Sequence, residues 1–115
     1  MAATPKHGEI WLADLGMLGK TRPVVVLLAD EVPVERTLVI YVPVTTQNRG
    51  SVLEVSLGHL RFLDAASVAN VQAIGALPRA RFERRLGTVP SADLEKIKQA
   101  IRVACGLGGD APTKD

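Results

Sequence analysis

The amino-acid sequence predicts a mainly β protein with one helix near its C-terminus. Short apolar runs, separated by turn residues, follow one another from residue 9 to residue 89, and only after Pro90 does the apolar spacing become helical. A parallel sheet would need helices between its strands, and the sequence indicates none there. We therefore expect a small, strongly bent antiparallel β-barrel of SH3-like size.

The chain is expected to form one domain over residues 1–106, because 115 residues can bury only one hydrophobic core. Residues 107–115 are Gly-rich and polar and are expected to form a flexible tail. The longest uncharged apolar stretch, Pro23–Ala29, has seven residues, against the ~20 that cross a bilayer. With no signal-like segment and a single cysteine, we expect a cytoplasmic protein without membrane association.

Six segments have the composition of strands. Pro23–Ala29 and Leu38–Val44 are continuously apolar and rich in valine, as expected of strands buried on both faces. Two glycines in the loop Gly16–Thr21 can adopt positive φ, and the polar residues Thr45–Gly50 end a strand and turn the chain. The expected strands are Glu9–Leu15, Pro23–Ala29, Leu38–Val44, Val52–Leu57, Ser67–Ile74 and Leu86–Val89.

The expected helix starts at Ser91, which can act as its N-terminal cap, and ends at Gly106. Asp93 and Glu95 lie in its first turn, where negative charge is favourable. Cys105 is interpreted as a small buried hydrophobic residue of the packed face and not as a reactive thiol. The apolar residues of this face are Leu94, Ile97, Ile101, Ala104 and Cys105.

The positive charge is unevenly distributed. The net charge is only +2, yet residues 79–85 hold four arginines against one glutamate, and arginine outnumbers lysine nine to five. Arginine is the better residue for two-point binding of phosphate or carboxylate, which favours a polyanionic partner. A solvated basic strand edge explains the same residues equally well. With only four aromatic residues, base stacking is not expected to be a major binding mode.

Common hydrolase and metal motifs are missing from the sequence. His7 and His59 are far apart, are expected to lie in loops, and have no metal-type spacing to acids or to Cys105. There is no phosphate-binding glycine loop, no Gly-x-Ser-x-Gly motif and no pair of acids in an apolar frame. We expect neither a metal nor another cofactor.

Two polar groups flank the apolar strands instead. Lys20, Thr21 and Arg22 precede one, and Thr45, Thr46 and Gln47 follow the next. If these strands are antiparallel neighbours, Arg22 and Thr45 meet at one rim, where a guanidinium and a hydroxyl could bind phosphate. Alternatively, Arg22 is a surface residue at a strand end and Thr45 a turn former.

The order of several sequence blocks resembles the MazF/PemK family of toxins over about Gly8 to Gly106. The blocks are Gly8–Leu15, Arg22–Val26, Val42–Gln47 and Gly87–Val89. The resemblance implies a dimeric SH3-like barrel that cuts single-stranded RNA such as mRNA, together with an antitoxin whose acidic, flexible segment covers the RNA site. Because DNA lacks the 2′-OH nucleophile, it should survive.

In that family the arginine and first threonine of these blocks are the catalytic pair, which implies that Arg22 and Thr45 are catalytic here. The implied reaction needs no metal, is sequence-specific, and leaves a 2′,3′-cyclic phosphate and a 5′-OH. We expect the RNA also to contact eight further residues: Lys20, Thr21, Thr46, Gln47, Asn70, Gln72, Arg79 and Arg81.

The chain departs from the family pattern at two places. The loop Gly16–Thr21 is shorter than usual in the family, where it often covers the active site, so we expect a more open pocket, and Asn70 stands where many members have an acid. Two other functions remain open. A sister group with this barrel poisons DNA gyrase through a tryptophan near the C-terminus, whereas the sole tryptophan here is Trp11. The other is a non-catalytic RNA-binding module.

Overall fold

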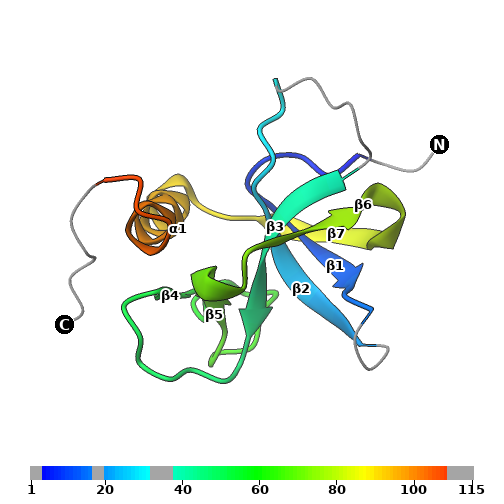
Figure 1. The fold of residues 1–115 in the computed structure, drawn as a ribbon. Coiled ribbons are helices and arrows are strands. Elements are labelled where there is room, and N and C mark those ends of the chain that lie inside the picture. Colours follow the sequence, from blue (N-terminus) through cyan, green and yellow to red (C-terminus); the bar gives the residue numbers. More distant parts are fainter. Residues whose placement is uncertain (1–3, 17–19, 32–37, 109–115) are drawn as a thin grey trace.

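The computed structural model describes residues 4–16, 20–31 and 38–108. Seven strands precede one helix, as the expected fold class requires (Figure 1). The strands are β1 (Glu9–Asp14), β2 (Thr21–Val26), β3 (Leu38–Thr45), β4 (Glu54–Ser56), β5 (Val68–Asn70), β6 (Gly75–Pro78) and β7 (Phe82–Thr88), and the helix is α1 (Ser91–Ala104).

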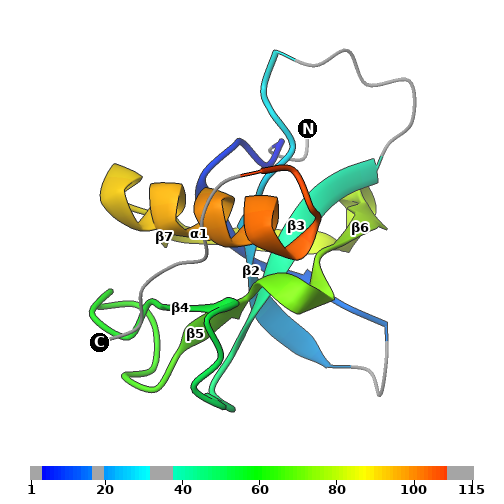
Figure 2. The same ribbon diagram turned by 60° about the vertical axis from the view of Figure 1, so that its left-hand side comes forward.

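All strand pairs in the sheet are antiparallel. The hydrogen-bonded order is β4-β5-β3-β2-β1-β7, and β6 pairs with the first half of β3. Within the described residues this path is open, with β4 and β7 at its two ends. The sheet bends so that β4 and β5 lie apart from β6 and β7 (Figure 1), and α1 lies across one side of it (Figure 2). The predicted antiparallel β fold with a terminal helix is confirmed, whereas the sheet predicted to form a barrel is not closed within the described residues.

Strand β2 is buried on both faces, as predicted from its valine run. Val24, Val25 and Val26 have no exposed surface. Val25 packs in a cluster that includes Ile97 of α1, whereas Val24 and Val26 pack in a second cluster on the other face with Trp11. Because successive side chains of a strand point to opposite faces, this strand holds the two apolar layers together.

The prediction that Leu38–Val44 is buried on both faces was wrong. Burial alternates along β3, and Leu38 and Ile40 are 39% and 40% exposed. The reason is the sheet bend. At this end β3 pairs with β6 and only one face of the pair is covered by the second cluster, so side chains on the other face reach solvent.

Several strand boundaries also differ from the predicted ones. The segment Ser67–Ile74 contains a strand only over β5 and then a 3-10 turn, Val71–Ala73. Strand β6 was not predicted, because Gly75–Pro78 contains glycine and proline, which are typical of turns. Strand β7 starts at Phe82 and not at Leu86, and β4 is restricted to Glu54–Ser56. Pairing with β1 keeps the charged residues of β7 extended, an effect that local composition does not reveal.

The helix was located correctly, and it stops at Gly106 as predicted, where φ is 68°, but the predicted side-chain cap at Ser91 was wrong. Pro90 is the residue before α1, Ser91 is the first helical residue, and no side chain caps this end. Ile97 and Ala100 are buried, whereas Ala104 and Cys105 are exposed. Cys105 is therefore not the buried hydrophobic residue we expected. No helix in the described part of the chain is long and apolar enough to span a membrane.

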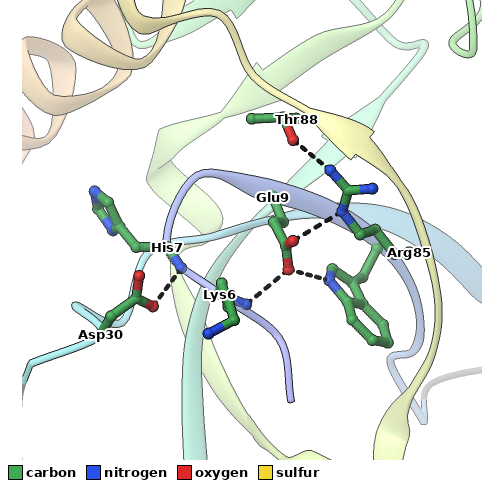
Figure 3. Close-up of polar contacts among 7 residues, drawn as sticks. Lys6, His7, Glu9, Asp30, Arg85 and Thr88 are labelled. Carbon is green, nitrogen blue, oxygen red and sulfur yellow. Dashed lines mark hydrogen bonds and ion pairs between the residues drawn. The ribbon is translucent and has the colours of Figure 1, made fainter. Parts of the chain in front are cut away.

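A polar cluster around Glu9 joins the N-terminal segment to β7 (Figure 3). The Glu9 carboxylate accepts hydrogen bonds from Trp11 Nε1 at 3.0 Å, from the Lys6 backbone N–H at 2.8 Å and from Arg85 Nε at 2.8 Å. Burial by itself raises the pKa of Glu9, but these hydrogen bonds and the charge of Arg85 outweigh it and hold the pKa below its ordinary value. The charged carboxylate is thus the form that the fold prefers.

Replacing this carboxylate tests how much the cluster stabilises the fold. A lowered pKa means that the stabilisation is complete above the ordinary pKa and is lost as the pH falls through the folded-state value. We expect Glu9→Gln to lower the free energy of unfolding by about 1.5–3 kcal/mol at pH 7, the range for hydrogen bonds to a charged group. The deficit should shrink below about pH 4, near the ordinary pKa of glutamate. Urea unfolding of both proteins at pH 7 and at a pH below about 4 measures this deficit in unfolding free energy. Glu95→Gln, on an exposed position of α1, is the control, and an equal deficit at both pH values would contradict the assignment.

Candidate functional site

The register of β2 against β3 governs the relation between Arg22 and Thr45. The two strands are antiparallel neighbours, as the sequence analysis required, with Val24 opposite Pro43 and Val26 opposite Tyr41. Continuing the same register by two residues brings Arg22 opposite Thr45. Directly opposed residues project from the same face of a sheet, so the two side chains are expected to be neighbours.

The hydrogen-bond pattern indicates how close these side chains come. The Leu27 N–H donates to the Ile40 carbonyl at 2.8 Å, so these opposed residues belong to a hydrogen-bonded pair. Pair types alternate along an antiparallel ladder, which makes Arg22 and Thr45 a non-hydrogen-bonded pair, the type with the shorter Cα–Cα distance. Pro23, between Arg22 and the pair Val24–Pro43, has no N–H to donate to β3. This missing bond explains why the regular ladder stops at Val24.

A pocket of about 220 Å³ opens at the end of β3. It is lined by side chains from β3, β4, β5 and the loops beside them. Four of these were predicted from the sequence as site residues and three were not. The lining residues are Thr45, Gln47, Arg49, Ser51, Glu54, Asn70 and Gln72.

Thr45 is partly buried in this pocket, and its hydroxyl has a defined neighbour. Thr45 Oγ1 accepts a hydrogen bond from the Gln47 backbone N–H at 3.1 Å. Because this contact uses a lone pair, the hydroxyl proton is left to be donated to a bound group. A threonine held in this way is oriented before any ligand arrives.

The amide side chains of the pocket come from β5 and the turn after it. Asn70 lies opposite Glu54 in the pairing of β5 with β4, and Gln72 is an exposed residue of the 3-10 turn. Together with Gln47 they offer both donors and acceptors, the combination that can hydrogen-bond the edge of a base. Gln47, Asn70 and Gln72, which the sequence analysis assigned to RNA binding, line this pocket together with Thr45, and their contact with RNA stays a prediction.

The remaining predicted residues do not line the pocket. Lys20, Thr21 and Arg22 lie exposed at the start of β2, and Thr46 is exposed just after β3. Thr21 Oγ1 donates to Glu83 Oε2 at 3.4 Å. This strand end is beside the pocket through the β2–β3 pairing, but these side chains are not part of the pocket wall.

The arginine-rich stretch 79–85 is divided between two places. Arg81 Nη1 lies 3.7 Å from Asp14 Oδ1, and Asp14 is paired with Thr21, so Arg81 belongs to the end of the sheet that carries Arg22. Arg79 instead lines a second pocket of about 120 Å³ with Leu38, at the opposite end of β3 from Thr45. Arg79 and Arg81, both assigned to RNA binding from the sequence, therefore have their side chains in different places. The chain reverses direction between the two arginines, at the 3-10 turn Arg79–Arg81.

Both histidines have partners that the sequence did not indicate. The His7 backbone N–H donates to Asp30 Oδ1 at 2.9 Å (Figure 3), and its ring Nδ1 is 3.0 Å from the Leu27 carbonyl oxygen. His59 Nε2 lies 2.9 Å from Asp93 Oδ2, a carboxylate that is nearly buried at the start of α1. Among the residues that the structure describes, no three His, Cys, Asp or Glu side chains gather in a way that could hold a metal ion.

The three pocket residues missed by the sequence analysis are Arg49, Ser51 and Glu54. Arg49 lies inside the polar turn Thr45–Gly50, where it was read as part of a turn. Ser51 and Glu54 form a Ser-x-x-Glu pattern, which is known for mutual side-chain and backbone hydrogen bonds at helix starts. Here the same spacing stabilises a turn, and the pattern could have identified Glu54 as a residue that shapes the site.

Comparison with known proteins matches residues 6–105 to one family, described as PemK-like, MazF-like toxins of type II toxin-antitoxin systems. The match spans the whole sheet and α1. The chain belongs to this family. The resemblance seen in the ordered sequence blocks is thereby confirmed.

Individual MazF proteins are similar along nearly their whole length. The chain is 33% identical over 102 residues to the Probable endoribonuclease MazF2 of Mycobacterium tuberculosis, covering 88% of this chain and 98% of that protein. Among solved structures, toxin MazF-mt6 of Mycobacterium tuberculosis has a TM-score of 0.77 at 28% identity, with 88% and 99% of the chains covered. An endoribonuclease in complex with its cognate antitoxin, from a mycobacterial species, has a TM-score of 0.79 at 26% identity, with 92% and 99% covered.

A designed crosslink tests the opposition of Arg22 and Thr45 in this MazF-like chain. In a Cys105→Ser background, Arg22→Cys with Thr45→Cys should close a disulfide on mild oxidation, because a non-hydrogen-bonded pair has a Cα–Cα distance of about 4.5 Å, within the range that a disulfide spans. Arg22→Cys with Gln47→Cys is the control and should keep both thiols. Intact-mass analysis of the monomer after thiol labelling counts them. Equal closure of both pairs, or none in the first, would refute the register.

Proposed function

We propose that this MazF-like toxin is an endoribonuclease that cuts single-stranded RNA in a sequence-specific way without a metal. The observation that carries the proposal is the pocket at the end of β3, where an oriented threonine stands among three amide side chains and beside the strand end that bears Arg22. The endoribonuclease names of relatives such as MazF2 support it. RNA such as mRNA is the proposed substrate and the cytoplasm the proposed location.

In the proposed reaction the ribose 2′ oxygen attacks the adjacent phosphorus. The bond from phosphorus to the 5′ oxygen breaks, which leaves a 2′,3′-cyclic phosphate and a 5′-OH. The proton lost from the 2′-OH is balanced by the proton gained at the 5′ oxygen. Negative charge grows on the phosphate oxygens in the transition state, and Arg22 would meet it with a guanidinium while Thr45 donates its hydroxyl proton.

We further propose that the protein acts as a homodimer and is inhibited by an antitoxin. A solved relative is an endoribonuclease in complex with its cognate antitoxin, which supports a similar partner here. An acidic, flexible antitoxin segment could follow the arginines at the site, because a disordered polyanion adapts to scattered charge. The RNA and this segment would then compete for the same surface.

The first test compares rates of RNA cleavage in EDTA. We expect Arg22→Ala to lower kcat/KM by about 10²- to 10³-fold, the usual cost of removing one preorganised donor, and Thr45→Ala to cost less because a hydroxyl carries no full charge. Arg22→Lys should recover little activity, because one ammonium cannot replace the two-point guanidinium contact. A timed assay on one single-stranded RNA with a mapped cut measures all three.

The control for this series is Arg102→Ala, which removes the same charge from an exposed position of α1. Circular dichroism verifies that each variant is folded. A folded Arg22→Ala variant that cuts within threefold of wild type would exclude the proposed mechanism. Binding without cleavage by wild type would favour an RNA-binding module, and inhibited supercoiling would favour a gyrase poison.

A second test uses the two arginines that the fold separates. Arg81 lies near Asp14 at the strand end that carries Arg22, whereas Arg79 lies at the other end of β3. We expect Arg81→Glu to weaken binding of both RNA and the cognate antitoxin at least five times more than Arg79→Glu does, since charge effects between exposed groups fade over about 8 Å in physiological salt. Fluorescence anisotropy titrations measure both ligands. Equal effects of the two variants would remove Arg81 from the site.

A further inference from the structure

An arginine other than Arg22 lines the pocket at the end of β3. Of the seven described residues in the pocket wall, Arg49 is the one cation and Glu54 the one anion. Arg49 is exposed, and none of the ion pairs described for the chain includes it. The guanidinium is therefore available to a ligand that enters this pocket.

The Glu54 carboxylate accepts hydrogen bonds from the backbone of the loop that carries Arg49. Its Oε1 and Oε2 accept from the Arg49 N–H at 3.1 and 3.2 Å, and Oε1 also accepts from the Ser51 N–H at 2.9 Å. These are charge-assisted hydrogen bonds, which are stronger than neutral ones. Glu54 thus determines where the backbone of Arg49 lies.

Two further contacts hold the same loop. Asn48 Oδ1 accepts from the Gly50 N–H at 2.9 Å, and Ser51 Oγ accepts from the Leu53 N–H at 3.0 Å. Gly50 has a φ of 73°, a conformation that glycine adopts without strain. The loop after β3 therefore has a defined shape before any ligand binds, although it contains no regular secondary structure.

We propose that Arg49 binds a backbone phosphate of the RNA next to the cleaved bond, and that Glu54 is the positioning residue that holds Arg49 there. This inference rests on the function proposed above. A strand in the pocket would present one base edge and at least one phosphate. The amides of Gln47, Asn70 and Gln72 suit the base edge, and Arg49 is the cation of this wall that can meet the phosphate.

The two arginines then have different kinetic roles. A phosphate beside the reacting one has the same charge before and during the reaction, so Arg49 binds the ground state and the transition state equally. Loss of Arg49 should raise KM and leave kcat nearly unchanged, whereas loss of Arg22 should lower kcat. This difference separates a binding residue from a catalytic one.

The test measures binding without cleavage. The probe is a labelled, mixed-sequence single-stranded DNA oligonucleotide, which lacks the 2′-OH and cannot be cut. We expect Arg49→Ala to weaken binding about tenfold or more, as for the loss of a charge-assisted contact. The slope of log affinity against log salt should fall by about 0.7, the value for one phosphate of a single strand. Arg49→Lys should keep the slope, and Arg102→Ala is the matched control.

Glu54 is tested by a double-mutant cycle. We expect Glu54→Gln and Glu54→Ala to weaken binding of the oligonucleotide, since both disturb the acceptor that positions the loop. In an Arg49→Ala background the same substitutions should have little further effect, because Glu54 acts through Arg49. A general loss of structure would instead add to the effect of Arg49→Ala, so the cycle separates the two even if Glu54→Ala unfolds and only Glu54→Gln can be used.

Each outcome has a definite meaning. Arg49→Ala with wild-type affinity and salt slope would overturn the inference, and additive losses at Glu54 would overturn its positioning role. Wild type that binds the oligonucleotide but does not cut RNA in EDTA would refute the proposed nuclease and leave the Arg49 contact to be judged by the binding data. Wild type that neither binds nor cuts would refute both.

Discussion

The antiparallel pairing of β2 with β3 is the constraint on which the site depends. The valines of β2 are fully buried and belong to two apolar clusters, one on each face of the sheet. Slippage by one residue would exchange those faces and move each valine into the wrong cluster, so the register is strongly held. The start of β2 therefore lies at a defined place in the sheet. Its polar residues, Thr21 and Arg22, emerge beside the end of β3, because antiparallel neighbours bring the start of one strand to the end of the other.

Carboxylates in this chain mainly organise the backbone and neighbouring cations. Glu9 accepts hydrogen bonds from Trp11, the Lys6 backbone and Arg85, and so connects the N-terminal segment to β7. These partners lower the pKa of Glu9. Glu54 likewise accepts hydrogen bonds from the loop after β3. Both carboxylates already accept several N–H groups as part of the fold. The proposed chemistry accordingly relies on guanidinium and hydroxyl groups.

Only part of the fold and site could be predicted from local patterns. The valine run predicted a strand buried on both faces and the apolar spacing after Pro90 predicted α1, because both signals come from periodic burial. Strand β6 and the exposed face of β3 were missed, since each depends on which strand lies alongside. Gln47, Asn70 and Gln72 were assigned to the site and do share its pocket with Thr45, but Arg49 and Glu54 were overlooked inside a turn. The catalytic roles of Arg22 and Thr45 stay predictions.

The sequence by itself determined the class of fold, the family and the order of the polar groups along the chain. Those properties depend on composition, on the spacing of apolar residues and on the order of sequence blocks along the chain. None of these changes with the residues that lie nearby in the folded structure. Only the tertiary structure decided which charges act together. It separated Arg79 from Arg81, left Cys105 in solvent, and joined Glu54 to the loop of Arg49. Such relations depend on bends and turns, where a few residues of chain can reverse direction, and distance along the sequence then no longer measures distance in space.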